Sequence, residues 1–160
     1  MCGFKEMWKR IVRKVWQKCP PLLRYRLVRA AQRKFTVSVG AIILNEENRV
    51  LLLDHLLRPK FSWGIPGGFI NASEQPVDAI KREIFEETGL ELEDIQMFRV
   101  RTIYRHVEIL YLARGRGTAE VKSREINALG WFAPEEMPAQ MSSAHKQLIR
   151  QVLTNADIRC

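Results

Sequence analysis

Apolar and polar residues follow a helical period over the first 34 positions of the chain. Apolar side chains recur every three or four positions, which places them on one face of a helix; they are Trp8, Ile11, Val12, Val15 and Trp16. Lysines and arginines occupy the other face. Pro20 and Pro21 end this helix, because proline lacks the amide hydrogen that a helix interior needs. A second, shorter helix is predicted over 22–32.

From residue 35 onward the pattern predicts strands and helices that interleave. Residues 35–44 and 49–54, joined by a turn, have the branched apolar character of two strands of a β-hairpin. A helix is predicted over about 76–88, and Gly89 follows at the position where a helix C-terminus favours glycine. The remaining predictions are a strand end at 63–68, strands at 97–104, 107–113 and 129–132, a turn at 114–117 and a helix at 142–153. This order favours a mixed sheet with helices packed on it.

The net charge of +8 is unevenly distributed along the chain of 160 residues. Residues 1–34 contain eleven Lys and Arg and one acidic residue, a net charge of +10, whereas residues 35–160 carry fifteen basic and seventeen acidic residues, a net charge of −2. The sequence therefore predicts a basic amphipathic helical arm at 1–34 and one near-neutral domain at 35–160.

The cysteines and the apolar runs bear on the compartment. Cys2, Cys19 and Cys160 have no metal-ligand spacing, so we expect free thiols in a reducing compartment, with a structural disulfide as the alternative. No apolar run has the length of a membrane span, and charges interrupt each apolar stretch before Pro20, unlike a secretory signal. A cytoplasmic location is the expectation.

Three glutamates on the helix predicted over 76–88 suggest a metal site. Glu83, Glu86 and Glu87 are spaced i, i+3, i+4 and so share one face. Like charges at this spacing repel by roughly 0.2–0.5 kcal/mol per pair, and a hard divalent cation would offset that repulsion. Taken alone, a solvated glutamate surface is the commoner interpretation of such a pattern.

The surroundings of the glutamates support a rigid setting. Val77, Ile80 and Ile84 occupy another face of the same helix, which we expect to pack on the sheet. Gly67 and Gly68 would allow the backbone to approach a metal or a phosphate closely.

A longer pattern surrounds these glutamates. From Gly68 to Leu90 the sequence is Gly-x5-Glu-x7-Arg-Glu-Ile-x-Glu-Glu-x-Gly-Leu. It resembles the Nudix box at every specified position, and the likeness extends more loosely over residues 35–155. The resemblance implies an α/β/α sandwich with a mixed β-sheet. It also implies a metal-dependent pyrophosphohydrolase that cleaves a phosphoanhydride of a nucleoside diphosphate linked to a group X, such as a nucleotide sugar or ADP-ribose, or of a (deoxy)nucleoside triphosphate.

The resemblance also assigns roles to residues. Glu83, Glu86 and Glu87, with the carbonyl of Gly68 or Gly67, match the family's ligands for Mg²⁺ or Mn²⁺. Arg82 matches an arginine that orients these glutamates, and Glu74 matches a structural carboxylate. Glu86 is the first candidate for the general base, and Glu125, in a later segment, is the second.

Other polar residues have two interpretations each. Arg58 and Lys60 precede the box and could reach substrate phosphates, although a solvated surface explains them as well. The same two interpretations apply to the residues that alternate along one predicted strand, namely Arg99, Arg101 and Arg105. Trp63 is expected in the core. The three histidines are expected to be structural or on the surface; they are His55, His106 and His145.

The function of the arm and of the whole chain leaves alternatives. A non-catalytic nucleotide-sensing module on the same fold is the alternative to the enzyme, but such modules usually lose box residues and this chain retains them all. The apolar face of the arm is expected to pack on the domain or across a homodimer. An anionic membrane surface, a nucleic acid or an organelle-targeting role are the other interpretations, and the absence of serine from residues 1–34 weakens the last.

Overall fold

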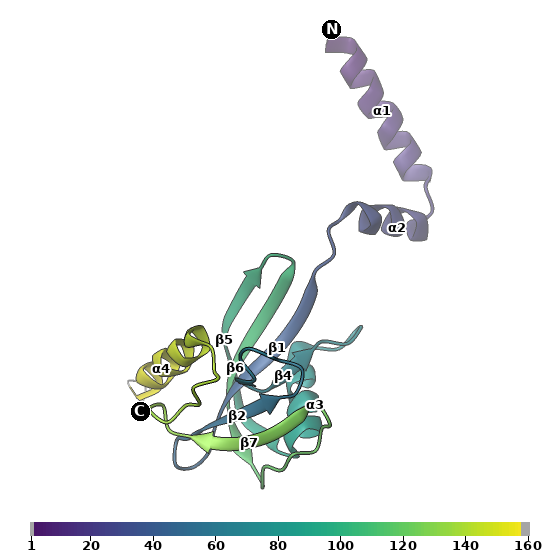
Figure 1. The fold of residues 1–160 in the computed structure, drawn as a ribbon. Helices are drawn as coiled ribbons and strands as arrows, with labels where there is room; N and C mark the ends of the chain where they lie inside the picture. Colours follow the sequence, from purple (N-terminus) through teal and green to yellow (C-terminus); the bar gives the residue numbers. More distant parts are fainter. Residues whose placement is uncertain (1, 158–160) are drawn as a thin grey trace. The chain divides into compact units, whose positions relative to one another are not determined.

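The computed structural model describes residues 2–157 of the chain, and its side chains are described for residues 5–154. The chain divides into two compact units, Met1–Phe35 and Thr36–Cys160 (Figure 1). Cys19 is a free cysteine. Cys160 and the side chain of Cys2, also expected to be free thiols, lie outside the described residues.

The first unit consists of two helices, as the apolar period predicts. Helix α1 spans Cys2–Lys18 and helix α2 spans Pro21–Ala31. Pro21 stands at the first position of α2, where its missing amide hydrogen costs no helical hydrogen bond. The large apolar side chains of α1 from Met7 to Trp16 are all exposed. None of the helices described between residues 2 and 157 is long and apolar enough to cross a membrane.

The second unit is built on a mixed seven-stranded sheet, which confirms the expected fold class. The strands run in the order β3-β2-β1-β6-β5, with β4 paired to β1 and β7 paired to β2. Strands β1 and β6 pair in parallel, and the other pairs of named strands are antiparallel. The strand bounds are β1 Thr36–Leu44, β2 Val50–His55, β3 Trp63–Gly64, β4 Gly67–Phe69, β5 Glu91–Ile103, β6 His106–Arg116 and β7 Ile126–Phe132.

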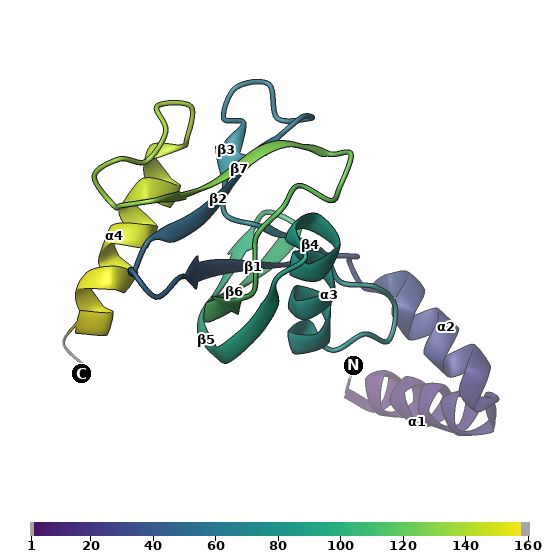
Figure 2. The same ribbon diagram turned by 90° about the horizontal axis from the view of Figure 1, so that it is seen from below.

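Alternate residues of the central strands feed two hydrophobic cores, because successive side chains of a strand point to opposite faces. On one face Val39, Ala41 and Ile43 of β1 pack with helix α3, Pro76–Thr88. On the other face Ile42 and Leu44 pack with helix α4, Ser143–Asp157. The sheet therefore lies between two helices, as an α/β/α sandwich requires (Figure 2).

Two strand predictions need correction. The hairpin of β1 and β2 is paired only next to its turn, at Leu44 and Val50, because β1 continues along β4 and β6 while β2 continues along β7. The turn predicted at 114–117 is wrong, since Arg114 to Arg116 continue β6 and pair with β5. Gly115 is there for space: a Cβ on it would lie 3.0 Å from Ile43 and 3.3 Å from Trp131.

The buried face of α3 also differs from the prediction. Ile80 and Ile84 are fully buried, as expected, but Val77 is 40% exposed and Ala79 is buried in its place. Val77 lies in the first turn of the helix, outside the part of α3 that covers the sheet. Trp63 packs edge-on against Phe132 with ring centroids 5.2 Å apart, which confirms its expected place in the core.

Candidate active site

Helix α3 presents its glutamates in a fixed orientation because its other face is anchored. Ile80, Ile84 and Thr88 are fully buried, and the Thr88 hydroxyl donates a hydrogen bond of 2.7 Å to the carbonyl of Ile84. The helix ends at Gly89, whose positive φ of 73° is favourable for glycine. This packing leaves Glu83 and Glu87 one turn apart on the side that faces the short strand β4.

Arg82 connects the carboxylates around the start of the site. Its Nε and Nη2 donate to the two oxygens of Glu74 at 2.7 and 2.9 Å, a bidentate ion pair. Its Nη1 donates to Glu83 at 2.8 Å and to Glu86 at 3.2 Å. Nη2 also donates to the Phe69 carbonyl at 3.1 Å. These bonds lower the pKa of Glu74 to about 2, with the hydrogen bond from Arg82 as the largest cause.

Strand β4 lies close to helix α3 at Gly68 and close to strand β1 at Gly67. A Cβ on Gly68 would overlap the carboxylate of Glu83. Gly67 has a φ of 143°, and a Cβ on it would overlap the carbonyl of Val39 on β1. The amide of Gly67 donates to Glu87 Oε2 at 3.2 Å. The backbone of β4 therefore forms one wall of the space in front of the glutamates.

A cavity of about 410 Å³ lies at this wall. It brings together Glu83, Glu87 and Glu125, three of the carboxylates proposed from the sequence. Arg58 and His55 also line it, with Leu57, Gly67, Gly68, Phe69 and Asn71. Glu86 does not line this cavity; its side chain is 58% exposed, against 17% for Glu83.

The cavity is electrostatically unfavourable for bare carboxylates. The pKa of Glu87 is raised to about 7, chiefly by burial and also by the charges of Glu83 and Glu125, against the hydrogen bond from Gly67 and the charge of Arg58. Arg58 is exposed as a residue, but its Nη1 lies 2.7 Å from where a Cβ of Gly64 would stand. Burial of this guanidinium lowers its pKa, while Glu87 and Glu108 act in the opposite direction.

These residues fit a divalent cation by their chemistry, although they are not preassembled around one. Among the described residues, no three His, Cys, Asp or Glu side chains are close enough to form a complete ligand set. Arg82 and the Gly67 amide hold the oxygens of Glu83 and Glu87 instead. A partly buried carboxylate with a raised pKa beside a second carboxylate is a setting in which a hard cation replaces the missing positive charge.

A second cavity of about 230 Å³ adjoins the first and shares Arg58, Gly67, Gly68 and Phe69 with it. Its other polar residues are Ser38, His106, Glu108 and His145. His106 is hydrogen-bonded to Ser38 at 2.9 Å and to Thr36 at 2.8 Å, so strand β1 fixes its ring. The shared wall makes the two cavities one candidate site with an acidic part and a more neutral part.

Several candidates from the sequence lie elsewhere. Lys60 is exposed with its Nζ 5.6 Å from the centre of the Phe61 ring, and it lines neither of these two cavities. Arg101 forms an ion pair with Glu108, a lining residue of the second cavity. Arg99 and Arg105 are exposed and also line neither cavity.

His55 and His145 are functional candidates that the sequence interpretation missed. His55 is buried beside the acidic cavity, and its Nε2 has no hydrogen-bond partner among the described residues. Its pKa is lowered to about 4, chiefly by burial and also by the charge of Arg58. Burial also lowers the pKa of His145, which lines the second cavity. The only sequence signal was the position of His55 at the end of an apolar strand.

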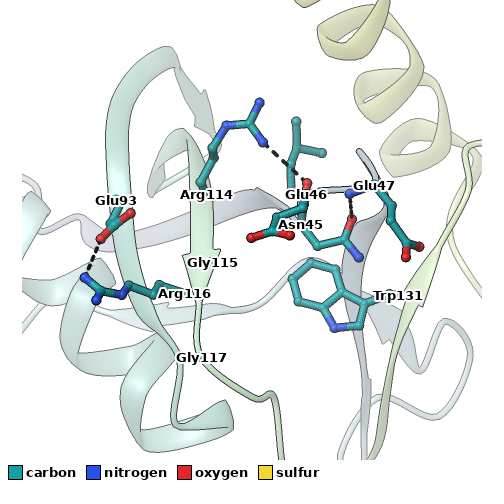
Figure 3. Close-up of a pocket in the computed structure, with 10 residues that line it drawn as sticks. Asn45, Glu46, Glu47, Glu93, Arg114, Gly115, Arg116, Gly117 and Trp131 are labelled. Atoms are coloured by element: carbon teal, nitrogen blue, oxygen red, sulfur yellow. Dashed lines mark hydrogen bonds and ion pairs between the residues drawn. The ribbon is translucent and has the colours of Figure 1, made fainter.

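A third cavity, of about 580 Å³, is lined by other residues (Figure 3). Its two arginines are paired with their neighbours: Arg116 with Glu93 at 3.1 Å, and Arg114 with the Asn45 carbonyl at 3.4 Å. The Asn45 side chain accepts a hydrogen bond from the amide of Glu47 at 3.0 Å. None of the proposed catalytic or metal-binding residues lines it, so the glutamate cavity is the candidate site.

Comparisons with known proteins agree with this architecture. The sequence model of the NUDIX domain matches residues 34–152. The crystal structure of a MutT NUDIX hydrolase from Burkholderia pseudomallei is 32% identical, with a TM-score of 0.66, and the match covers 75% of this chain and 99% of that one. A MutT-like protein from Streptomyces ambofaciens is 27% identical over 76% of this chain and 79% of its own length.

A further relative matches over a shorter segment. An RNA pyrophosphohydrolase from Pseudomonas fluorescens is 41% identical over 63 residues, which are 39% of this chain and 38% of that protein. The chain belongs to the Nudix hydrolase family, whose members act on phosphorus-containing anhydrides and generally use divalent metal ions.

Proposed function

We propose that this chain is a divalent-metal-dependent pyrophosphohydrolase acting on a nucleoside diphosphate linked to a group X or on a nucleoside triphosphate. The observation that carries the proposal is the convergence of Glu83, Glu87 and Glu125 on one cavity walled by the Gly67-Gly68 backbone. The similarity to a MutT-like protein and to an RNA pyrophosphohydrolase supports the reaction class.

In this proposal Glu83 and Glu87 hold the metal from inside the cavity, with the carbonyl of Gly68 beside them. Glu86 adds a third carboxylate from the exposed edge of the site. It lies close to Glu83, because both accept a hydrogen bond from Nη1 of Arg82. Mg²⁺ or Mn²⁺ would neutralise the pyrophosphate and lower the pKa of a bound water. Arg82, held by Glu74, keeps the glutamates oriented when the metal is absent.

The proton of the attacking water needs a carboxylate that can reach the cavity. Glu125 lines the cavity and is near enough for its charge to raise the pKa of Glu87. Glu86 is largely exposed and held by Arg82. The cavity lining therefore supports Glu125 as the general base over Glu86, since a base must lie within hydrogen-bonding reach of its proton.

The substrate is expected to lie along both cavities. Arg58 lines both and carries the positive charge that a pyrophosphate between them requires. The acidic cavity would receive the scissile anhydride with its metal. The second cavity, with His106 and His145, would receive one of the groups attached to it. Lys60 has no place in this arrangement.

A substrate screen tests the proposal. The purified chain is incubated with nucleotide sugars, ADP-ribose and nucleoside triphosphates in Mg²⁺ or Mn²⁺, and released monophosphate or pyrophosphate is measured. Glu87→Gln should lower turnover by about a hundredfold or more, because it removes a charged ligand from inside the cavity. Asp78→Asn removes one negative charge from the exposed first turn of the same helix and should leave turnover near the wild-type value.

Chelation should abolish turnover, and activity that persists in excess chelator would contradict the metal assignment. Comparison of Glu125→Gln with Glu86→Gln decides the base, since the base variant should lose kcat while still binding metal. Binding of these nucleotides without any turnover would favour a non-catalytic nucleotide-sensing module.

A further inference from the structure

Helix α1 has an apolar face that is open to solvent. Trp8 is 60% exposed and Val15 is 65% exposed. The other members of this face are also exposed: Met7, Ile11, Val12 and Trp16. At 3.6 residues per turn these side chains occupy one half of the helix circumference. A contiguous apolar face with two tryptophans is unusual for a surface that contacts only water.

The other half of α1 is strongly basic. Arg10 and Arg13 lie in this half, and Lys9 and Lys14 lie at its two edges. Lys5 and Lys18 lie within the apolar arc, near the two ends of the helix. Glu6 is the one acidic residue among residues 1–34, and it pairs with Lys9 at 2.8 Å. Helix α2 adds Arg24, Arg26 and Arg29 and has no buried residue. The unit therefore combines a net charge of +10 with an uncovered apolar face.

We propose that α1 lies flat on the surface of an anionic lipid bilayer, with Trp8, Val15 and Trp16 in the acyl boundary and the lysines and arginines at the headgroups. An anionic bilayer complements both halves of the helix at once, because it offers hydrocarbon beneath a layer of negative charge. Tryptophan favours this boundary, and flanking lysines can extend their ammonium groups to the headgroups.

Two other kinds of partner would complement only one of the two halves of α1. A nucleic acid would neutralise the basic side chains through its phosphates but would leave the apolar face in water. A second copy of the chain could cover the apolar face, but it would bring two units of +10 within a Debye length of about 10 Å at ordinary salt. The charge of the unit therefore opposes self-association and favours an anionic surface.

The test compares two substitutions that change the net charge equally. Val15→Glu places a carboxylate in the apolar half, whereas Gln17→Glu places one about 200° further round the helix, in the basic half. The full chain is mixed with vesicles of phosphatidylcholine containing one third phosphatidylglycerol, and with pure phosphatidylcholine vesicles, and bound protein is measured by flotation. The wild type should bind the anionic vesicles, and the fluorescence of its tryptophans should shift to the blue.

The electrostatic loss common to both variants is about fivefold per charge. Val15→Glu should lose roughly a further tenfold or more, because a carboxylate is expelled from hydrocarbon. Val15→Ser keeps the net charge and a comparable helix propensity, so its loss of binding would arise from the apolar face alone. Circular dichroism checks that each variant keeps its helices.

Three outcomes would overturn the proposal. Equal losses for Val15→Glu and Gln17→Glu would mean that the partner is recognised by charge alone, as a nucleic acid is. A wild-type dimer in the absence of vesicles that Val15→Glu alone dissociates would assign the face to a second copy. Failure of the wild type to bind the anionic vesicles, or equal binding to neutral ones, would remove the lipid partner.

Discussion

At the scale of single residues, Arg82 forms hydrogen bonds with more groups of the site than any one glutamate does. Its guanidinium donates to Glu74, Glu83 and Glu86 and to the carbonyl of Phe69. Only a planar fork with several donors can satisfy partners in these different directions, so lysine is no substitute for arginine here. The order of the acidic helix face therefore depends on a side chain that we do not place on the metal.

Arg82→Lys should weaken metal binding and lower kcat by about 10- to 100-fold, because the glutamates lose their orientation while keeping their charge. Titration of Mn²⁺ followed by a spectroscopic signal measures the affinity, and steady-state kinetics measure kcat. Arg150→Lys, on an exposed arginine of α4, is the matched control and should change neither. Metal affinity unchanged in Arg82→Lys would show that the glutamates need no orienting arginine.

His55 gives the domain a defined dependence on pH. Its pKa is lowered from 6.5 to about 4 in the folded chain, so between these values the unfolded chain binds more protons. The free energy of unfolding therefore rises with pH across this range. The contribution of His55 to it is lost as the pH falls from about 6.5 to about 4. A shift of this size corresponds to roughly 3 kcal/mol, at about 1.4 kcal/mol per pKa unit.

His55→Leu should remove that share of the pH dependence. Urea unfolding of the wild type and the variant at several pH values from about 4 to about 7 measures the difference between their slopes. The comparison cancels groups that titrate alike in both proteins. Parallel slopes for the two proteins would mean that His55 is charged in the folded domain at low pH.

At the scale of elements, helix α3 shows what local sequence can and cannot determine. Its ends were predictable because Pro76 favours a first turn and Gly89 adopts the left-handed conformation that ends a helix. Its buried face was predicted only in part. Val77 fits the apolar period as well as Ile80 and Ile84 do, but it is 40% exposed and takes no part in the core beneath α3.

Two core substitutions measure this difference. Ile84→Ala should lower the free energy of unfolding by about 2–5 kcal/mol, because it opens a cavity in the core beneath α3. Val77→Ala, with the same end residue, should change it by about 1 kcal/mol or less, because Val77 is 40% exposed. If denaturant unfolding showed equal losses of unfolding free energy for the two variants, Val77 would contribute to the core as much as Ile84 does.

Some parts of the candidate site follow from local sequence, and others depend on contacts between residues distant in the chain. The grouping of Glu83, Glu86 and Glu87 on one face follows from helical spacing alone. The proximity of Arg58, His55 and Glu125 to them depends on how β2, α3 and β7 come together, which spacing along the chain does not encode. The same limit explains the wrong turn at 114–117, where glycine serves packing between layers.

At the scale of the whole molecule, the two units have different chemistry. The family match covers residues 34–152 and so begins where the basic arm ends. The domain packs its apolar side chains into two cores, whereas the large apolar side chains of α1 from Met7 to Trp16 are exposed. We expect substitutions on α1 such as Val15→Glu to weaken the binding of the chain to anionic membranes and to leave its turnover of soluble nucleotides unchanged.

The close contact between Gly68 and the Glu83 carboxylate also constrains how this chain can change over time. A side chain at position 68 would displace the Glu83 carboxylate from the place where Arg82 holds it at 2.8 Å. A change at position 68 is therefore felt first by the orientation of Glu83. A descendant with no use for that orientation would be free to change both positions.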